Sequence, residues 1–136
     1  EEALNFAKEK GYKVFSLWRY EHGQVMFRAG ELDQSEGYPF NCPWDAGIEG
    51  FVLVSEKITE WNDQTYLEVA NSMMEDLTDW CNGNVYGFII KDDDGEELDS
   101  CWSFLGFDSV KEAATYSANS LLEELPKQLE LEGLAV

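Results

Sequence analysis

Basic side chains are scarce in this sequence. Nine Lys and Arg stand against 28 Asp and Glu, which gives a formal net charge of -19 at pH 7. Binding nucleic acid or an anionic membrane through a broad surface needs Lys and Arg to replace counterions. The scarcity of bases therefore excludes direct nucleic-acid binding of that kind and argues against a membrane partner. A basic protein surface is the natural complement.

Cysteine, histidine and long apolar runs are also scarce. The three cysteines, Cys42, Cys81 and Cys101, are an odd number, which favours a reduced cytoplasmic setting. With the single histidine, His22, they show no close C-x-x-C spacing, so we expect no metal site and no cofactor. The longest apolar run, about four residues, is too short for a membrane span, and the chain opens without a secretory-signal pattern.

Apolar residues are nevertheless plentiful enough to build a core. The chain has 136 residues, 44% of them hydrophobic and 14% aromatic, which excludes an intrinsically disordered acidic chain. We expect one domain over residues 1–136. Residues 1–28 carry five bases and four acids, a net of +1, whereas residues 29–136 carry four bases and 24 acids, a net of -20. The negative charge therefore belongs to the later part of the chain.

Periodicity and turn residues predict the elements in order. The expected elements are a helix over 1–10 ended by Gly11, a hairpin of strands 12–20 and 24–28, an irregular loop over 30–47, a strand over 51–55, a helix over 63–81, a hairpin of strands 85–91 and 98–104, and a helix from Ser109 that Pro126 interrupts. This order, αββ-loop-βαββα, predicts an α+β fold. We expect one antiparallel sheet of about five strands with two main helices packed on it.

Several details of these elements are expectations in their own right. Asn62 or Asp63 is the expected N-cap of the 63–81 helix, and Ser109 with Glu112 has the form of a capping box for the last helix. The strand over 85–91 is apolar on both faces, which is typical of a central strand. Of the five tryptophans, Trp18, Trp80 and Trp102 fall on expected inward positions, and a core role is also favoured for Trp44 and Trp61, which lie in loops next to acids.

Three arrangements suggest chemistry, and each has a simpler explanation. The triple Asp92-Asp93-Asp94 before Gly95 fails the EF-hand pattern and fits an exposed hairpin turn. A thiol nucleophile built from Cys42 or Cys101 with His22 is disfavoured, because surrounding negative charge makes a cysteine a poorer nucleophile. Asp45 and Asp99 resemble a glycosidase carboxylate pair, but we favour a structural role in which both anchor the 42–47 loop.

Acidic residues crowd the predicted helices and the second hairpin. Like charges three or four residues apart on a helix repel, and acids near a helix C-terminus oppose its dipole, so such faces cost stability. The candidate partner-binding residues are Glu68, Glu75, Asp76 and Asp79 on the 63–81 helix, Asp92, Asp93 and Asp94 on the hairpin, and Glu123 and Glu124 on the last helix.

Two strings are distinctive together. They are Cys42-Pro43-Trp44-Asp45-Ala46-Gly47 and Asp99-Ser100-Cys101-Trp102-Ser103-Phe104, with Tyr20-Glu21-His22 upstream. In these strings the chain resembles a family of small uncharacterised proteins from bacteriophages and other mobile elements, although Ala46 and Ser103 stand where Ser and Gly are usual. The resemblance implies a phage-derived protein of the host cytoplasm and carries over no catalytic residue.

Charge and resemblance together favour a non-enzymatic inhibitor, acting as a monomer or homodimer. We expect an anti-restriction or anti-CRISPR protein that occupies the basic nucleic-acid-binding surface of a host defence complex by DNA mimicry. One alternative is a small enzyme or ligand-binding protein that uses the 42–47 loop and the 99–102 strand. The other is an acidic accessory protein without mimicry, whose charge serves solubility.

Overall fold

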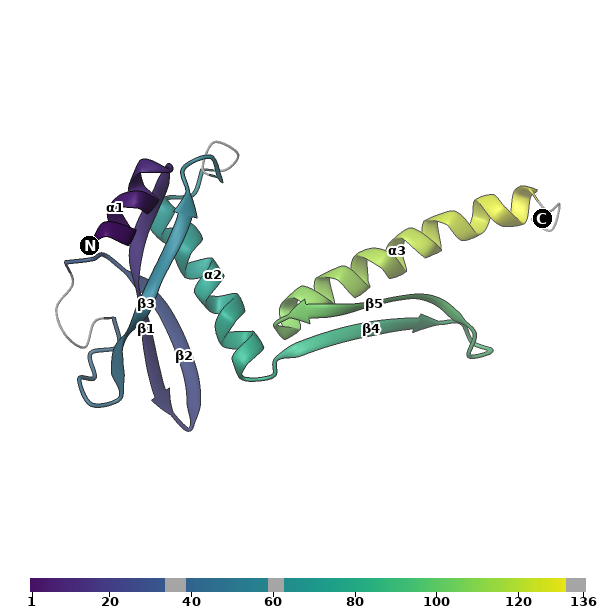
Figure 1. The fold of residues 1–136 in the computed structure, drawn as a ribbon. Coiled ribbons are helices and arrows are strands. Elements are labelled where there is room, and N and C mark those ends of the chain that lie inside the picture. Colours follow the sequence, from purple (N-terminus) through teal and green to yellow (C-terminus); the bar gives the residue numbers. More distant parts are fainter. Residues whose placement is uncertain (34–38, 59–62, 132–136) are drawn as a thin grey trace. The chain divides into compact units, whose positions relative to one another are not determined.

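The computed structural model describes residues 1–33, 39–58 and 63–131, with side chains described up to residue 125. Its order of elements confirms the α+β fold and the predicted sequence of helices and strands (Figure 1). The elements are α1 (Glu2–Glu9), β1 (Tyr12–His22), β2 (Gln24–Gly30), β3 (Ala46–Ser55), α2 (Tyr66–Cys81), β4 (Val85–Lys91), β5 (Glu97–Leu105) and α3 (Phe107–Leu131).

The strands form two antiparallel sheets instead of the single sheet that we expected. One sheet has three strands in the order β2-β1-β3, and the other consists of β4 and β5. The chain divides accordingly into two compact units, residues 1–82 and 83–136, which are described separately. Strand periodicity shows which face of a strand is apolar but not which strand it pairs with, so the sequence left this division undetermined.

The first unit is built around β1. Its hairpin with β2 turns at Gly23, which has a φ of 81° that favours glycine. On its other side β1 pairs with β3, and the register shifts so that Leu17 faces Gly50 while Trp18 faces Ile48, which leaves Glu49 as an extra residue. β3 begins at Ala46, five residues before the predicted strand, because the end of the expected loop pairs with β1.

Helix α2 covers one face of this sheet. Its Val69, Ala70 and Met74 pack with Phe15, Ala29, Val52 and Val54 of the strands in a buried core. The helix begins later than expected, because Thr65 is its N-cap. Thr65 and Glu68 exchange the hydrogen bonds of a capping box, so the expectation of an Asp63 cap was wrong, and Asn62 lies outside the described residues.

Two polar side chains of α2 and that of its C-cap residue, Asn82, bind the outer edge of β2. The backbone N–H groups of Val25, Phe27 and Ala29 donate to Asn82 Oδ1, Thr78 Oγ1 and Asn71 Oδ1 at 3.1, 2.9 and 3.0 Å. The amide groups of Asn82 and Asn71 donate back to the carbonyls of Val25 and Ala29. Side chains of a helix thus replace a neighbouring strand at this edge.

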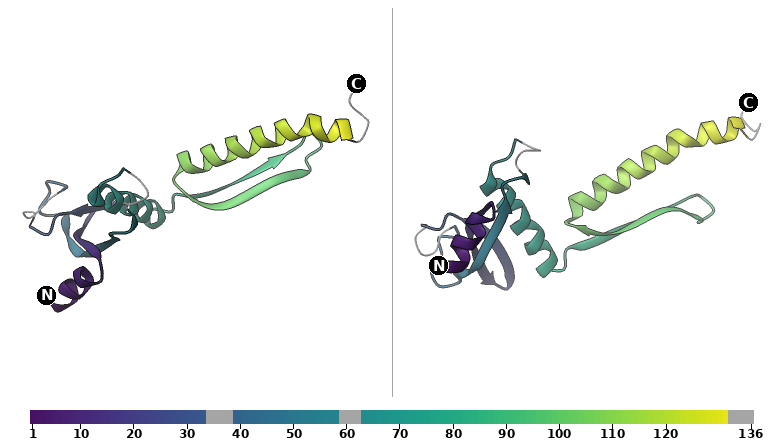
Figure 2. Two further views of the ribbon diagram at one scale, coloured as in Figure 1. Left: turned by 90° about the horizontal axis from the view of Figure 1, so that it is seen from above. Right: turned by 45° about the horizontal axis from the view of Figure 1, so that its top comes forward.

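The second unit is the β4–β5 hairpin with α3 running beside it in both views of Figure 2. Strand β4 pairs only with β5 in the described part of the chain, so it is an edge strand and not the central strand that we expected. Both faces of β4 carry apolar side chains, but α3 packs against only one of them. Phe88 takes part in the side that meets α3, and Ile89 on the opposite side is half exposed.

Helix α3 differs from prediction at both ends. It begins at Phe107 after Gly106, which has a φ of 80°, so Ser109 lies within the helix and is not its cap. It also continues past Pro126 to Leu131. A proline removes the hydrogen bond to the carbonyl four residues earlier, here that of Leu122, a residue exposed enough for water to serve as donor.

The tryptophans divide between core and surface. Trp18 is 2% exposed and donates from Nε1 to Ser16 Oγ at 2.9 Å, as expected of a core residue. The core predictions for Trp80, Trp102 and Trp44 were wrong, since these side chains are 65%, 64% and 92% exposed, and Trp61 lies outside the described residues. Periodicity indicated an apolar face for Trp80 and Trp102, but the described residues leave both side chains largely exposed.

Candidate functional site

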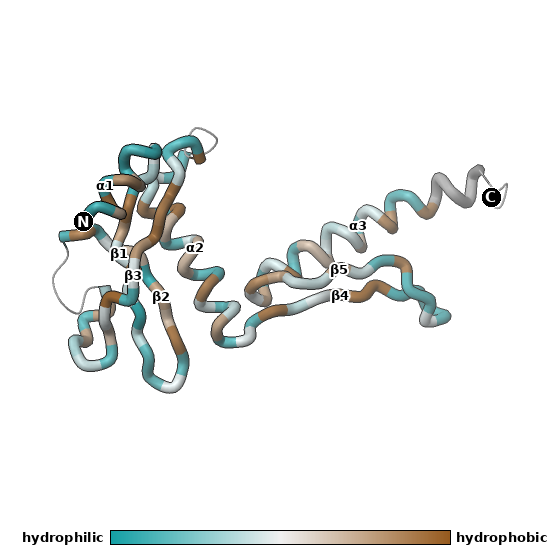
Figure 3. Tube along the Cα trace, viewed as in Figure 1, coloured by the Kyte–Doolittle hydropathy of each residue, from teal (hydrophilic) through white to brown (hydrophobic). Residues whose placement is uncertain are grey.

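The turn between β4 and β5 holds the densest acidic cluster among the described residues. Five of the six positions from 92 to 97 are carboxylates, and all are exposed. Asp92 shapes the turn, because its Oδ1 accepts from the N–H groups of Asp94 and Glu96 at 3.0 and 2.8 Å. Gly95 supplies a φ of 86°. Figure 3 shows the turn as a hydrophilic stretch at the end of two more apolar strands. The carboxylates are therefore displayed on an ordered support.

Little positive charge accompanies this cluster within its own unit. Over residues 83–125 the structure places ten carboxylates and two lysines, Lys91 and Lys111. The ion pairs given by the described residues, Lys13–Glu56, Arg19–Glu21, Arg19–Glu49 and His22–Asp45, all belong to the first unit. Glu123 and Glu124 are exposed on α3. Because α3 continues about two further turns, they do not oppose its dipole, which acts within the last turn.

The four predicted acids of α2 lie in the first unit and serve different roles. Glu68 accepts from Thr65 N at 2.7 Å and from Thr65 Oγ1 at 2.9 Å, and these hydrogen bonds lower the pKa of Glu68. Asp79 is half buried and shares with Glu75 and Arg28 the wall of a cavity of about 300 Å³. Glu75 and Asp76 are exposed. Glu75 and Asp76 are therefore the carboxylates of α2 most open to a partner.

The loop before β3 presents Trp44 to solvent on a hydrogen-bonded turn. The N–H of Ala46 donates to the carbonyl of Cys42 at 3.2 Å, and the N–H of Glu21 donates to the carbonyl of Asp45 at 3.0 Å. The Asp45 carboxylate also lies 3.4 Å from His22 Nδ1 and accepts from Cys42 Sγ at 3.8 Å. The Asp45 carboxylate thus contacts a thiol and an imidazole, and not the backbone amides that we predicted.

This loop also brings Cys42 and His22 together, as a thiol-nucleophile hypothesis requires. Both contact the same carboxylate oxygen of Asp45, and the hydrogen bonds described here include none between the thiol and the imidazole. A base that activates a thiol must reach the thiol proton directly. The arrangement supports a structural cluster better than a catalytic one.

Asp99 acts elsewhere than we expected. It faces α3 from β5 and accepts hydrogen bonds from Ser117 Oγ and from the N–H of its neighbour Ser100. The bond from Ser117 ties β5 to α3 inside the second unit, so the prediction that Asp99 anchors the 42–47 loop was wrong. The sequence could not show this, because Ser117 lies 18 residues away in the chain.

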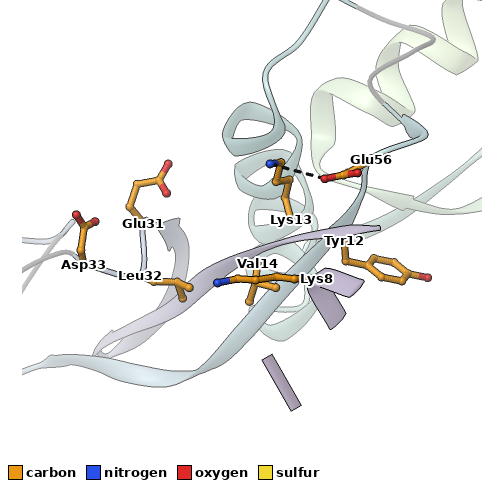
Figure 4. Close-up of a pocket in the computed structure, with 8 residues that line it drawn as sticks. All are labelled: Lys8, Tyr12, Lys13, Val14, Glu31, Leu32, Asp33 and Glu56. Atoms are coloured by element: carbon orange, nitrogen blue, oxygen red, sulfur yellow. Dashed lines mark ion pairs between the residues drawn. The ribbon is translucent and has the colours of Figure 1, made fainter. Parts of the chain in front are cut away.

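A cavity of about 500 Å³ in the first unit has mixed charge (Figure 4). Its wall includes the lysines Lys8 and Lys13 and three carboxylates. Lys13 lies 3.7 Å from Glu56 and 5.7 Å from the ring centroid of Tyr66. None of the candidate partner-binding acids lines this cavity, and its charges do not select a ligand of one sign.

Comparisons with known proteins found no relative of this chain. The chain matches no protein-family model, no curated protein and no solved structure. In the described residues no group of three or more His, Cys, Asp or Glu side chains is arranged to hold a metal ion. The same residues contain no helix with the length and apolar character that crossing a bilayer requires.

Proposed function

We propose that the protein is a non-enzymatic inhibitor that occupies a basic nucleic-acid-binding surface of a partner protein. The observation that carries this proposal is the β4–β5 turn, where five of six consecutive positions are exposed carboxylates held by the Asp92 hydrogen bonds. A groove lined with Lys and Arg that binds phosphates also attracts an ordered row of carboxylates, because its positive potential acts on both kinds of anion. The turn offers such a row.

Exposed carboxylates outside the turn add negative surface charge in both units. Glu75 and Asp76 on α2, and Glu123 and Glu124 on α3, are open to solvent. Trp44 supplies an exposed aromatic surface next to Asp45. An arginine of a partner can stack its guanidinium plane on the indole and donate hydrogen bonds to the neighbouring carboxylate. The partner is therefore expected to be rich in Arg and Lys.

The resemblance to bacteriophage proteins supports a biological setting for this binding. A phage protein that acts in the host cytoplasm meets restriction enzymes and RNA-guided nucleases, whose DNA-binding grooves are basic. We propose an anti-restriction or anti-CRISPR role on these grounds. The hairpin turn and Trp44 are the elements to test against such a groove.

The decisive experiment is inhibition of DNA cleavage by a panel of purified restriction enzymes and RNA-guided nucleases. The protein should inhibit at least one member, compete with its DNA, and lose affinity steeply as NaCl rises from about 50 mM to about 500 mM. Inhibition that is insensitive to salt, or no binding to any basic nucleic-acid-binding protein of the panel, would contradict the proposal.

Charge-matched variants separate a defined binding surface from general acidity. Asp93→Asn with Asp94→Asn removes two charges and keeps the Asp92 hydrogen bonds. Glu1→Gln with Glu2→Gln removes two charges at α1. The first variant should weaken inhibition about tenfold or more and the second should have little effect, since screening confines each charge to its neighbourhood. Equal losses in both variants would favour an acidic accessory protein without mimicry.

A further inference from the structure

The two edges of the three-stranded sheet differ in a way that points to a partner. The outer edge of β2 is bound by Asn71 and Thr78 of α2 and by its C-cap residue, Asn82. The other edge strand is β3, and among the described residues no further strand pairs with it. An edge strand carries a row of N–H and C=O groups that can pair with another chain.

The second half of β3 lacks the features that usually protect such an edge. Residues 50–55, Gly-Phe-Val-Leu-Val-Ser, contain no charge and no proline and are rich in residues that favour strands. Val52 and Val54 point into the core, at 3% and 0% exposed, while Phe51 and Leu53 on the opposite face are 52% and 43% exposed. Only Glu49, the bulge residue before this segment, is charged, and Arg19 binds it at 3.0 Å.

We propose that β3 is a homodimer interface, in which two copies of the chain pair their β3 strands antiparallel into a continuous six-stranded sheet. The occupant is a second copy because an antiparallel strand edge is self-complementary under a two-fold axis. A basic partner gains nothing from an uncharged edge, whereas a second copy with the same charge of -19 can approach closely only where charge is low.

The pattern along β3 selects the register. Pairing centred on Val52 places Phe51 opposite Leu53 of the second copy, so that the exposed apolar side chains cover each other on one face. The only charged residue of β3, Glu49, lies at the end of the paired segment, where Arg19 of the same copy binds it. Shape and charge thus agree on one arrangement.

Added salt should change the affinity of the dimer and the affinity for a basic partner in opposite directions. Two chains of charge -19 repel, and added salt screens this repulsion, so the dimer should tighten as ionic strength rises. Binding to a basic groove should weaken over the same range. The dimer can therefore succeed or fail independently of the proposed function.

Sedimentation velocity of the full chain tests the proposal. The dimer fraction should rise with protein concentration and with NaCl between about 50 mM and about 500 mM. Leu53→Lys should weaken dimerisation about tenfold or more, because it removes the apolar contact with Phe51 of the second copy and adds one charge on each side of the two-fold axis. Met26→Lys on β2 is the matched control, since Met26 is 44% exposed on the edge that α2 closes, and it should leave the dimer unchanged.

Hydrogen exchange keeps the proposal testable where a variant folds poorly. In the wild-type chain, alternate amides of residues 50–55 should gain protection as concentration rises, and the amides of β2 should not. A chain that stays monomeric at high concentration and high salt would overturn the proposal. So would a dimer that dissociates with salt, or one that Leu53→Lys and Met26→Lys weaken equally.

Discussion

The hydrogen bond from the Phe27 N–H of β2 to Thr78 of α2 can be tested quantitatively with one substitution, Thr78→Val. Valine keeps the shape of threonine and has a similar helix propensity, so packing changes little. The substitution removes the acceptor of the Phe27 N–H, now 2.9 Å from Thr78 Oγ1. The hydroxyl also donates to the carbonyl of Met74 at 2.7 Å, but that carbonyl lies within the helix and keeps its backbone partner.

The cost follows from leaving one donor without a partner. A buried donor without an acceptor costs about 1–3 kcal/mol, and because Phe27 and Thr78 are only half buried we expect about 1–2 kcal/mol in the free energy of unfolding. For a unit of 82 residues this corresponds to a fall in Tm of roughly 4–16 °C. Urea unfolding followed by the fluorescence of buried Trp18 measures the change.

Ser72→Ala is the matched control. Ser72 Oγ also donates to the carbonyl four residues earlier, that of Glu68, but it lies on the exposed side of α2 and makes no described bond to β2. The control should leave stability nearly unchanged, and hydrogen exchange of the Phe27 amide should accelerate only in Thr78→Val. Equal stability and equal exchange in the two variants would refute the conclusion that α2 closes this edge by hydrogen bonding.

Two further predictions concern single positions. Hydrogen bonds from Thr65 hold the pKa of Glu68 below its ordinary value of 4.5. The stability that ionised Glu68 gives is therefore present above that value and is lost as the pH falls through the lowered pKa. A pH series of urea unfolding should show this loss in the wild type and not in Glu68→Gln, which keeps a capping-box side chain. At Gly87 a Cβ would clash with the indole of Trp102. Gly87→Ala should therefore destabilise the β4–β5 hairpin by about 1–3 kcal/mol, which is measured as faster hydrogen exchange of the hairpin amides. Gly50→Ala is the control, because a Cβ at Gly50 meets nothing within 4 Å, and it should leave the exchange of the hairpin amides unchanged.

Local features of the chain were predictable because they depend on neighbours in sequence. The β1–β2 turn at Gly23, the β4–β5 turn at Gly95 and the end of α2 before Gly83 follow from glycines that adopt positive φ. The acidic turn at Asp92, Asp93 and Asp94 was identified because its carboxylates are consecutive. The contacts of Asp45 with Cys42 and His22 were not predicted.

Features that depend on distant contacts were not predictable. A spacing of seven residues puts Asn71 and Thr78 on one side of α2, and the C-cap residue Asn82 follows four residues later. Nothing in that pattern says that the edge of β2 lies there. The prediction of buried Trp80 and Trp102 failed for a related reason. An apolar periodicity identifies a face, and whether another element covers that face depends on the packing of the whole chain.

Composition and short-range periodicity are enough to predict the α+β class, the order of elements and the charge of -19. Three-dimensional packing sets the other features: the strands form two sheets, Asp99 binds Ser117, Trp44 is exposed, and α2 closes one edge of a sheet whose other edge strand is β3. Most of these features join residues that are far apart in the chain. Their energies depend on which surfaces meet, and a linear pattern does not contain that information.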